Sequence, residues 1–464
     1  MNQLNNGQEA ASVAFAQFLF SDSPFFVISG PAGTGKTFLM NYLSNKGLQD
    51  YTDGCALIGI KPVYTETVFT ATTNKAAEVL ETSIGKPVQT IHSYLGLKVR
   101  ENYKTGKTDI EKSNTWRVRS NKVVFIDECS MIDSNLFKFL LEGFTDSKIV
   151  FVGDHAQMAP VGETLSPIYT EVSLGNFAAL FEPVRNAGSP ALIALCDQLR
   201  DTVETGIFKP MAEVPGVIDY LNDDQMEAAI MHEFQDLDPS ARVLCYTNER
   251  VQMFNDHIRT DVRHRNDPLT PGDTVVVARA FQLGKTTLSV ERELVISSVS
   301  EAKYNHDFDL ILGEFGPLVY VDVGFRGFSA NPDDGSQFTL PVCLNTSHLD
   351  YVLKHYSSRK NWRDFYDLRN SFLDIRDKAA CTVYKSQGST YDTVFVDIGN
   401  IGTSFDAQQV ARMLYVAVSR ARTRVCFYGQ LPARYHSTNG VPAWTRNPGP
   451  KSSPTTSVPE TVVA

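Results

Sequence analysis

One segment constrains this chain more than any other: the run Gly30-Pro31-Ala32-Gly33-Thr34-Gly35-Lys36-Thr37. It fits the phosphate-binding pattern G-x-x-x-x-G-K-[ST], and apolar residues before it predict a strand over Phe25–Ser29. A helix is predicted to follow from Thr37 to Ser44 and to end near Gly47. In this setting, glycines let backbone N–H groups turn toward an anion, and the helix N-terminus adds a positive dipole end. This phosphate-binding loop (residues 30–37) therefore predicts a nucleoside triphosphate site, with Lys36 on the β- and γ-phosphates and Thr37 on Mg²⁺.

Length and composition indicate a soluble protein of several domains. A chain of 464 residues is too long for one typical core, so we expect about two to four domains. No apolar run is long enough to span a bilayer, and the polar N-terminus does not have the pattern of a signal peptide. The 7 cysteines include no close pairs, which favours a reducing cytoplasm and argues against a zinc site or a disulfide framework. The formal net charge of −10 gives no support for a broad basic surface but leaves room for a narrow basic channel.

Alternating apolar and helical patterns predict an α/β protein with two parallel sheets. The predicted strands are Phe25–Ser29, Thr67–Ala71, Val123–Ile126 and Ile149–Val152 in a first set, and Arg242–Tyr246, Cys381–Tyr384, Thr393–Asp397 and Arg424–Tyr428 in a second. We therefore expect a first domain over 1–180 and a second built from 181–270 and 381–440. Between them, 271–380 combines a β-rich insert with a helical pair. Residues 445–464 are rich in Pro, Ser and Thr and are expected to be disordered.

Polar side chains at two predicted strand ends add hydrolytic chemistry to the loop. Asp127 and Glu128 follow the apolar strand Val123–Ile126 and, in an α/β sheet, would lie beside the phosphate-binding loop. Asp127 would hold Mg²⁺, and Glu128 would take the proton from the attacking water. Gln157, after the strand Ile149–Val152, would contact the γ-phosphate or that water, unless its segment is simply a polar loop.

An arginine from the second predicted domain would complete such a site. Arg420 lies in the run 414–422, and an arginine on the γ-phosphate stabilises transition-state charge, typically by about 10³–10⁵ in rate. It would also make domain closure depend on the nucleotide. Arg185, in the run 182–185, is a second candidate. The alternative for either side chain is a surface ion pair.

Six motifs follow one another in the order found in superfamily 1 helicases. Besides the phosphate-binding loop they are Thr70-Ala71-Thr72-Thr73-Asn74-Lys75-Ala76-Ala77, Thr90-Ile91-His92-Ser93, Gly153-Asp154-His155-Ala156-Gln157-Met158-Ala159-Pro160-Val161, Thr382-Val383-Tyr384-Lys385-Ser386-Gln387-Gly388-Ser389 and Tyr415-Val416-Ala417-Val418-Ser419-Arg420-Ala421. On these residues the chain resembles the RecD-like branch of that superfamily, and most closely the Dda-type helicases of T4-like bacteriophages. The resemblance covers about residues 4–430.

The resemblance implies roles for individual residues. Gln8 would hydrogen-bond the adenine of ATP, and Gly388 would lie near the nucleotide. Neutral hydroxyl and amide contacts suit a moving strand, because each is weak enough to be broken and remade at every step. Two residues depart from the family pattern: Tyr384 stands where relatives commonly have His, and Asn74 stands where many of them have His. The residues implied to contact single-stranded DNA are Thr72, Asn74, Lys75 and His92 in the first domain and Thr247, Asn248, Thr382, Lys385 and Ser386 in the second.

The inserted segments also resemble parts of these helicases. The polar segment 97–116 is a predicted hairpin and is similar to the strand-separating wedge. Tyr103, just before its turn, would stack on the last base pair or, with equal weight, is a surface residue. Residues 271–345 resemble an SH3-like β module, and 346–380 resemble a helical tower. The tower aromatics that would face the wedge, or else simply pack, are Trp362, Phe365 and Tyr366.

The expected fold is therefore α/β, with two RecA-like P-loop domains, a β-hairpin inserted in the first, and the SH3-like module and tower inserted in the second. The expected function is that of an ATP- and Mg²⁺-dependent DNA helicase, with 5′→3′ movement implied by the family branch. An RNA helicase or ribonucleoprotein remodeller and a nucleotide-gated clamp with slow hydrolysis are the alternatives. Expected partners are single-stranded DNA, strand junctions and a single-strand-binding or replication protein. We expect a monomer in the cytoplasm, or in the host cytoplasm if the protein is from a phage, and both replication and recombination are compatible roles.

Overall fold

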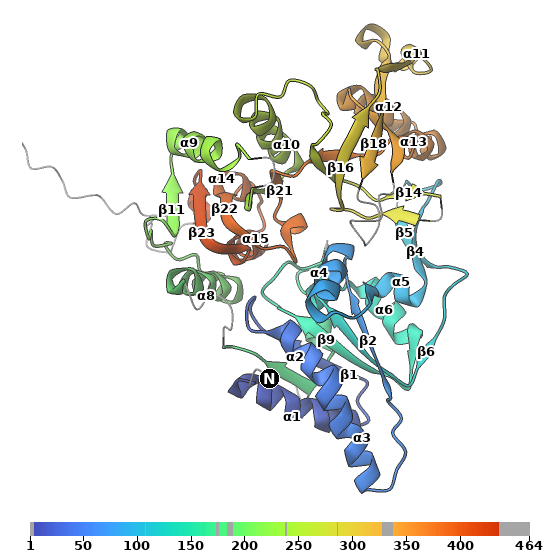
Figure 1. Cartoon of the computed structure of the whole chain (residues 1–464), viewed down its shortest axis with the longest axis vertical. Coiled ribbons are helices and arrows are strands. Elements are labelled where there is room, and N and C mark those ends of the chain that lie inside the picture. The colour runs from blue at the N-terminus through green and yellow to red at the C-terminus, as the bar shows by residue number, and fades with distance from the viewer. Residues whose placement is uncertain are drawn as a thin grey trace, which may run out of the picture.

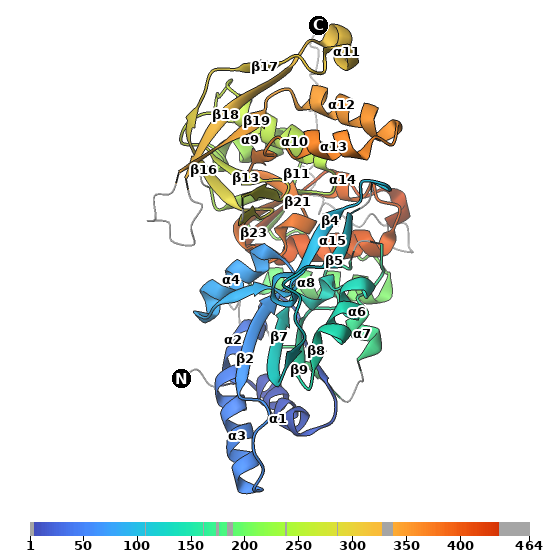
Figure 2. The same cartoon turned by 90° about the vertical axis from the view of Figure 1, so that its right-hand side faces the viewer.

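The computed structural model describes residues 4–106, 108–160, 162–172, 176–182, 189–236, 239–284, 286–326 and 337–435. Arg185 and the tail 445–464 lie outside the described residues. Across these ranges, no helix is both long and apolar enough to cross a membrane. Figures 1 and 2 show the N-terminal α/β part at one end of the long axis and the later parts of the chain at the other.

The first sheet is parallel throughout and lies between two layers of helices. Its elements are β1 (Phe25–Ser29), β2 (Glu66–Ala71), β3 (Val88–Thr90), β7 (Lys122–Asp127), β9 (Lys148–Gly153), β10 (Phe177–Ala179), α1 (Asn6–Phe20), α2 (Lys36–Tyr42), α4 (Asn74–Ile84), α5 (Ile91–Leu95) and α6 (Ser134–Gly143). The strand order is β10-β1-β9-β7-β2-β3. One face packs on α1, α2 and α4 and the other on α5 and α6, each through one apolar cluster. The loop after β1 therefore opens at the carboxyl edge of a buried sheet.

The helix after the phosphate-binding loop is longer than its sequence predicts. α2 continues through a π-helical turn at Leu43–Gly47 into α3 (Leu48–Leu57). Gly47 has helical backbone angles, φ −63° and ψ −39°, and a Cβ there would lie 3.0 Å from the ring of Phe15. The prediction that the helix ends near Gly47 is wrong, because this glycine lets α1 pack closely instead of stopping the helix.

The second sheet is also parallel throughout. Its elements are β11 (Ile218–Leu221), β12 (Ala241–Cys245), β21 (Ala380–Thr382), β22 (Tyr391–Asp397), β23 (Ala421–Tyr428), α8 (Pro190–Thr205), α9 (Asp223–Glu233), α10 (Asn248–His257), α14 (Ile398–Ile401) and α15 (Ala407–Ser419). The strand order is β11-β23-β22-β12-β21, with α8, α14 and α15 packed on one face and α9 and α10 on the other. The strand predicted over Cys381–Tyr384 ends at Thr382, where a 3-10 turn at Tyr384–Ser386 follows.

A third, antiparallel sheet is inserted between β12 and β21. It contains β13 (Thr274–Val277), β16 (Glu293–Val299), β17 (Lys303–Asn305), β18 (Leu318–Arg326), β19 (Phe338–Cys343) and β20 (Ile375–Asp377). The helices α12 (Thr346–Ser358) and α13 (Trp362–Arg369) come between β19 and β20. The helical segment predicted over 346–380 is therefore too long: β20 pairs with β13, and the adjacent Leu373 is buried in the core of this sheet.

The predicted hairpin reaches from the first sheet to α13. It consists of the antiparallel strands β4 (Leu97–Glu101) and β5 (Thr108–Lys112), and Figure 1 shows it extending toward the antiparallel sheet. The ring of Tyr103 meets Tyr366 edge-on, with centroids 5.5 Å apart. Gly106, with φ +70°, is so close to α13 that a Cβ there would lie 2.5 Å from the ring of Trp362. The hairpin thus contacts the helical pair through its turn.

Candidate nucleotide site and strand-binding surface

The phosphate-binding loop is shaped by its glycines. Gly33 (φ +86°) and Gly35 (φ +78°) adopt the left-handed backbone conformation, which is strained for residues that have a Cβ. Gly30 is required by a close approach, because a Cβ there would lie 2.6 Å from the carbonyl oxygen of Leu180. These glycines let the chain turn tightly from β1 into α2.

Lys36 lies across this loop. Its Nζ donates to the carbonyl oxygens of Gly30 at 2.7 Å and Pro31 at 2.9 Å. The hydroxyl of Thr34 donates to the same Pro31 oxygen at 3.0 Å. All these acceptors are neutral, so the ammonium group keeps its full charge for a phosphate.

Two carboxylates stand at the end of β7. Burial, and then the charge of Glu128, raise the pKa of Asp127 to about 7, while Lys36 acts in the opposite direction. Glu128 has φ +53°, which is uncommon for a residue other than glycine and is typical of strained functional sites. Thr72 holds this turn, because its N–H donates to the carbonyl oxygen of Asp127 at 3.3 Å and its hydroxyl to that of Glu128 at 3.2 Å.

The donor set at this edge fits Mg²⁺. A hard cation takes oxygen ligands, and Mg²⁺ bound with a nucleotide needs only one or two from the protein. Thr37 and Asp127 both line the same cavity. A cation beside Asp127 would also favour the ionised carboxylate that burial disfavours. Thr37 and Asp127 are therefore the residues that would hold the metal.

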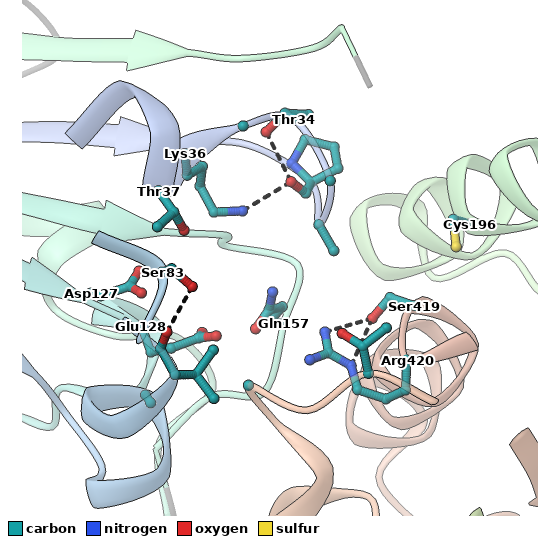
Figure 3. A pocket seen from close by; sticks show the side chains of 18 of the residues that line it. Thr34, Lys36, Thr37, Ser83, Asp127, Glu128, Gln157, Cys196, Ser419 and Arg420 are labelled. Atoms are coloured by element: carbon teal, nitrogen blue, oxygen red, sulfur yellow. Dashed lines mark hydrogen bonds between the residues drawn. The ribbon is translucent and has the colours of Figure 1, made fainter. Parts of the chain in front are cut away.

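These groups line a cavity of about 330 Å³ between the first and second sheets. In Figure 3, Lys36, Thr37, Asp127 and Glu128 lie on one side, Arg420 lies on the other, and Gln157 lies between them. The lining also contains Pro31, Ala32, Gly33, Thr34 and Gly35 from the loop and Gly388, Thr390, Tyr415 and Ser419 from the second sheet. The structure thus brings most of the predicted nucleotide residues to one place.

Gln157 and Arg420 have hydrogen-bonding capacity to spare in this cavity. Gln157 is 3% exposed, and within the described part of the chain its Oε1 has no hydrogen-bond partner. Arg420 is 5% exposed and donates to Ser419 Oγ at 2.8 Å and to the carbonyl oxygens of Val416 and Ser389 at 3.2 and 3.3 Å. A buried guanidinium with neutral acceptors alone is well suited to receive an anion.

Gln8 lies outside this cavity. It is 2% exposed, its Oε1 accepts from the N–H of Asn5, and its Nε2 donates to the carbonyl oxygen of Thr34 at 3.3 Å. Gln8 therefore caps α1 and supports the loop, and its hydrogen bond to an adenine stays a prediction.

Two aromatic rings in the cavity were not predicted. Phe38 and Phe181 both line it, and they are 39% and 76% exposed. Flat rings at the edge of a nucleotide cavity can stack on a base. The only sequence signal for them is their position, since Phe38 directly follows Thr37 and Phe181 directly follows Leu180, which packs on the loop.

The residues of the first α/β part that are predicted to contact single-stranded DNA lie at the carboxyl edge of its sheet. Thr72 follows β2, Asn74 and Lys75 begin α4, and His92 lies in α5 directly after β3. Asn74 is exposed, whereas burial lowers the pKa of His92 and favours its neutral form. Lys75 forms an ion pair with Glu78 at 3.7 Å.

Three residues of the second α/β part that are predicted to contact single-stranded DNA also lie at the carboxyl edge of its sheet. Thr247 follows β12 and Thr382 ends β21, and these strands are parallel neighbours with Cys245 opposite Thr382. Asn248 is exposed at the start of α10. The hydroxyl of Thr247 accepts from Asn400 Nδ2 at 3.1 Å, which fixes this edge.

Lys385 and Ser386, the other members of the second set, are placed differently from Thr247 and Asn248, and Thr382 is also buried. Lys385 is 3.5 Å from Glu291 and lines a small cavity together with Lys75 of the first sheet. Ser386 is fully buried, and its hydroxyl donates to the carbonyl oxygen of Val383 at 2.7 Å. In this conformation Ser386 stabilises the turn after β21 and does not present its side chain to a DNA strand.

Two family models match the chain. Residues 3–206 match an AAA domain, and residues 378–428 match a UvrD-like helicase C-terminal domain. The two matched segments contain the phosphate-binding loop and Arg420, the groups that face each other across the cavity.

Relatives match over almost the whole chain. The ATP-dependent DNA helicase dda of Enterobacteria phage T4 is 24% identical, over 92% of this chain and 99% of that protein. The uncharacterized protein R530 of Acanthamoeba polyphaga mimivirus is 21% identical, over 91% of this chain and 99% of that protein.

Solved structures of Pif1 helicases also match. The Candida albicans enzyme is 18% identical, with 92% of this chain and 95% of that chain covered and a TM-score of 0.42. The Bacteroides enzyme in complex with ADP-AlF3 and single-stranded DNA is 14% identical, with 94% of each chain covered and a TM-score of 0.46. By its six ordered motifs, the two family models and the near full-length similarity to dda, the chain resembles superfamily 1 helicases of the Dda type.

Proposed function

We propose that this protein is an ATP-dependent DNA helicase that moves 5′→3′ along single-stranded DNA and separates the strands of a duplex. The observation that carries the proposal is the cavity in which Lys36, Asp127 and Glu128 lie opposite Arg420. A site shared by two sheets changes when the sheets close, so nucleotide turnover there can drive a movement. The choice of DNA is supported by the similarity to the phage T4 enzyme, and the direction by the resemblance to Dda-type helicases.

Each polar residue of the cavity would have its own role in ATP hydrolysis. Lys36 and Arg420 would stabilise the charge on the β- and γ-phosphates from opposite sides. Glu128 would accept the proton of the attacking water, and the unpartnered Oε1 of Gln157 would orient that water. Mg²⁺ beside Asp127 would supply further positive charge.

The first and second sheets would act as two RecA-like domains that grip the strand in turn. The strand would follow the carboxyl edges of both sheets, past Thr72 and Asn74 on one and Thr247, Asn248 and Thr382 on the other. These groups are neutral, so each contact contributes only about 1 kcal/mol and can be broken at every step. Closure on ATP would bring the two grips together, and hydrolysis would release one of them.

The hairpin would act as the wedge, with the antiparallel sheet as the SH3-like module and the helices α12 and α13 as the tower. Tyr103 is 50% exposed and meets Tyr366 edge-on, so its ring is braced by α13 and its exposed part would contact a base pair. Asn370 adds a hydrogen bond of 3.0 Å to Glu101, which lies next to the turn of the hairpin. A wedge must resist the duplex that it splits, and these contacts stiffen it.

The test is the rate of ATP hydrolysis without nucleic acid, with single-stranded DNA and with single-stranded RNA, all at one salt concentration. Strong stimulation by DNA alone is expected, and a duplex with a 5′ or a 3′ single-stranded tail would then reveal the direction. Equal stimulation by RNA would favour an RNA remodeller. Absence of stimulation by either would refute a motor and leave a nucleotide-gated clamp.

A further inference from the structure

The loop that carries Gln157 leaves the first sheet but is buried in the second. It follows β9, and its apolar residues Ala156 and Met158 are 0% and 1% exposed within the apolar cluster that joins α8 and α15 to the second sheet. Arg412 of α15 donates to the carbonyl oxygens of His155 and Gln157. The backbone around Gln157 is therefore held by the opposite side of the nucleotide cavity.

Asp154, at the start of this loop, is the polar centre of the contact. Its carboxylate is 0% exposed and accepts hydrogen bonds from Arg200 at 2.6 Å, from Tyr415 at 2.6 Å and from the N–H of Ala156 at 3.1 Å. Burial, and then the charge of Asp154, raise the pKa of Tyr415 well above that of an exposed tyrosine, so its hydroxyl remains a donor. Charge-assisted hydrogen bonds to a buried carboxylate are stronger than ordinary ones.

The contacts of Arg412 and Tyr415 come from one face of α15. Arg412, Tyr415 and Ser419 are three and then four residues apart, which places them on the same side of the helix, and Arg420 follows directly. Tyr415, Ser419 and Arg420 also line the nucleotide cavity. A movement of α15 would therefore displace Arg420 and the loop of Gln157 together.

We propose that Tyr415 is a positioning residue, which links α15 to Asp154 so that Gln157 and Arg420 are set relative to each other and approach the γ-phosphate as a unit. Arg200 holds the same carboxylate from α8. The inference rests on the proposed function, because it assigns a purpose to the spacing of two groups that act on ATP. Without this link ATP would still bind, but Gln157 and Arg420 would no longer be correctly placed relative to each other.

The test is Tyr415→Phe, which removes only the hydroxyl and keeps the volume of the ring. We expect kcat for DNA-stimulated ATP hydrolysis to fall about 10- to 100-fold, the equivalent of one hydrogen bond to a charged group, with KM for ATP nearly unchanged. The matched control is Tyr435→Phe. Tyr435 is 2% exposed in the same apolar cluster, and its hydroxyl donates to the carbonyl oxygen of Ser404 in the loop between α14 and α15, away from the loop of Gln157. This control should keep the kcat of the parent protein.

A double variant distinguishes the loss of the contact between Tyr415 and Asp154 from a general loss of stability. Asp154→Asn should lower kcat in the same way, and adding Tyr415→Phe to it should cost little more, because both changes break one contact. The proposal is overturned if Tyr415→Phe keeps the parent kcat, if it lowers kcat no more than Tyr435→Phe, or if the two losses simply multiply. If the parent protein hydrolyses ATP and the Tyr415→Phe variant does so at the same rate, only the link is refuted and the proposed function stands. Parent protein without ATP hydrolysis refutes the proposed function, and the link with it.

Discussion

Replacing Arg420 by Ala is the sharpest test of a site shared by two sheets. Its guanidinium is buried at the cavity, and the hydrogen bonds that it donates there go to Ser419 Oγ and the carbonyl oxygens of Val416 and Ser389, which are neutral. Its charge is therefore not neutralised by these partners and is available to a phosphate. Arginines in this role contribute about 10³–10⁵ in rate, or roughly 4–7 kcal/mol at 1.36 kcal/mol per tenfold. We expect Arg420→Ala to lower kcat for DNA-stimulated ATP hydrolysis by that factor.

A neighbouring arginine provides the control. Arg422 is two residues further along, its side chain is 57% exposed, and it pairs with Asp392 at 2.6 Å. Exposed ion pairs contribute only about 0–1 kcal/mol, so Arg422→Ala should fold normally and hydrolyse ATP at nearly the parent rate. Steady-state phosphate release at saturating ATP and DNA measures both variants. If Arg420→Ala retains more than about a tenth of the parent rate, the assignment of this arginine to the γ-phosphate is refuted.

Three further predictions concern the loop, the hairpin and the metal. Lys36→Ala should abolish ATP turnover while the unfolding temperature stays close to that of the parent, because its acceptors are loop carbonyls at the surface of a cavity; parent-like turnover would exclude the site. Tyr103→Ala should slow the opening of a tailed duplex more than ATP hydrolysis, since the ring lies on the hairpin, and equal losses would exclude a wedge. The pKa of Asp127 is raised to about 7, so protonation below that pH should oppose Mg²⁺. The Mg²⁺ concentration for half-maximal turnover should therefore rise about tenfold per pH unit below 7 and level off above it, and a value independent of pH would contradict this.

The sequence contained enough to predict both parallel sheets and one side of the cavity. Apolar runs bounded by polar turns mark the inner strands of both sheets but not the short edge strands β3, β10 and β11, and the loop fingerprint locates the phosphates. Parallel strands present their carboxyl ends at one edge, so Asp127 and Gln157 had to lie near Lys36 once the strands were recognised. The errors lie where tertiary packing decides: Gly47 remains helical against Phe15, and residues after Arg369 form a strand because β13 offers a partner.

The contact between Asp154, Arg200 and Tyr415 illustrates what a local pattern lacks. Arg200 and Tyr415 stand in amphipathic helices, where their spacing indicates only a face, and nothing in either helix names a carboxylate of the first sheet as partner. The pairing exists because two apolar residues, Ala156 and Met158, insert the loop of the first sheet into the core of the second. That insertion depends on how the two sheets meet, which is a property of the whole chain. It also means that the polar contact cannot be lost alone: any movement that separates α15 from the first sheet must either expose these two residues or carry the loop along. Since exposing them would cost about 25 cal/mol for every Å² of apolar surface, the loop is expected to follow α15, and Gln157 with it.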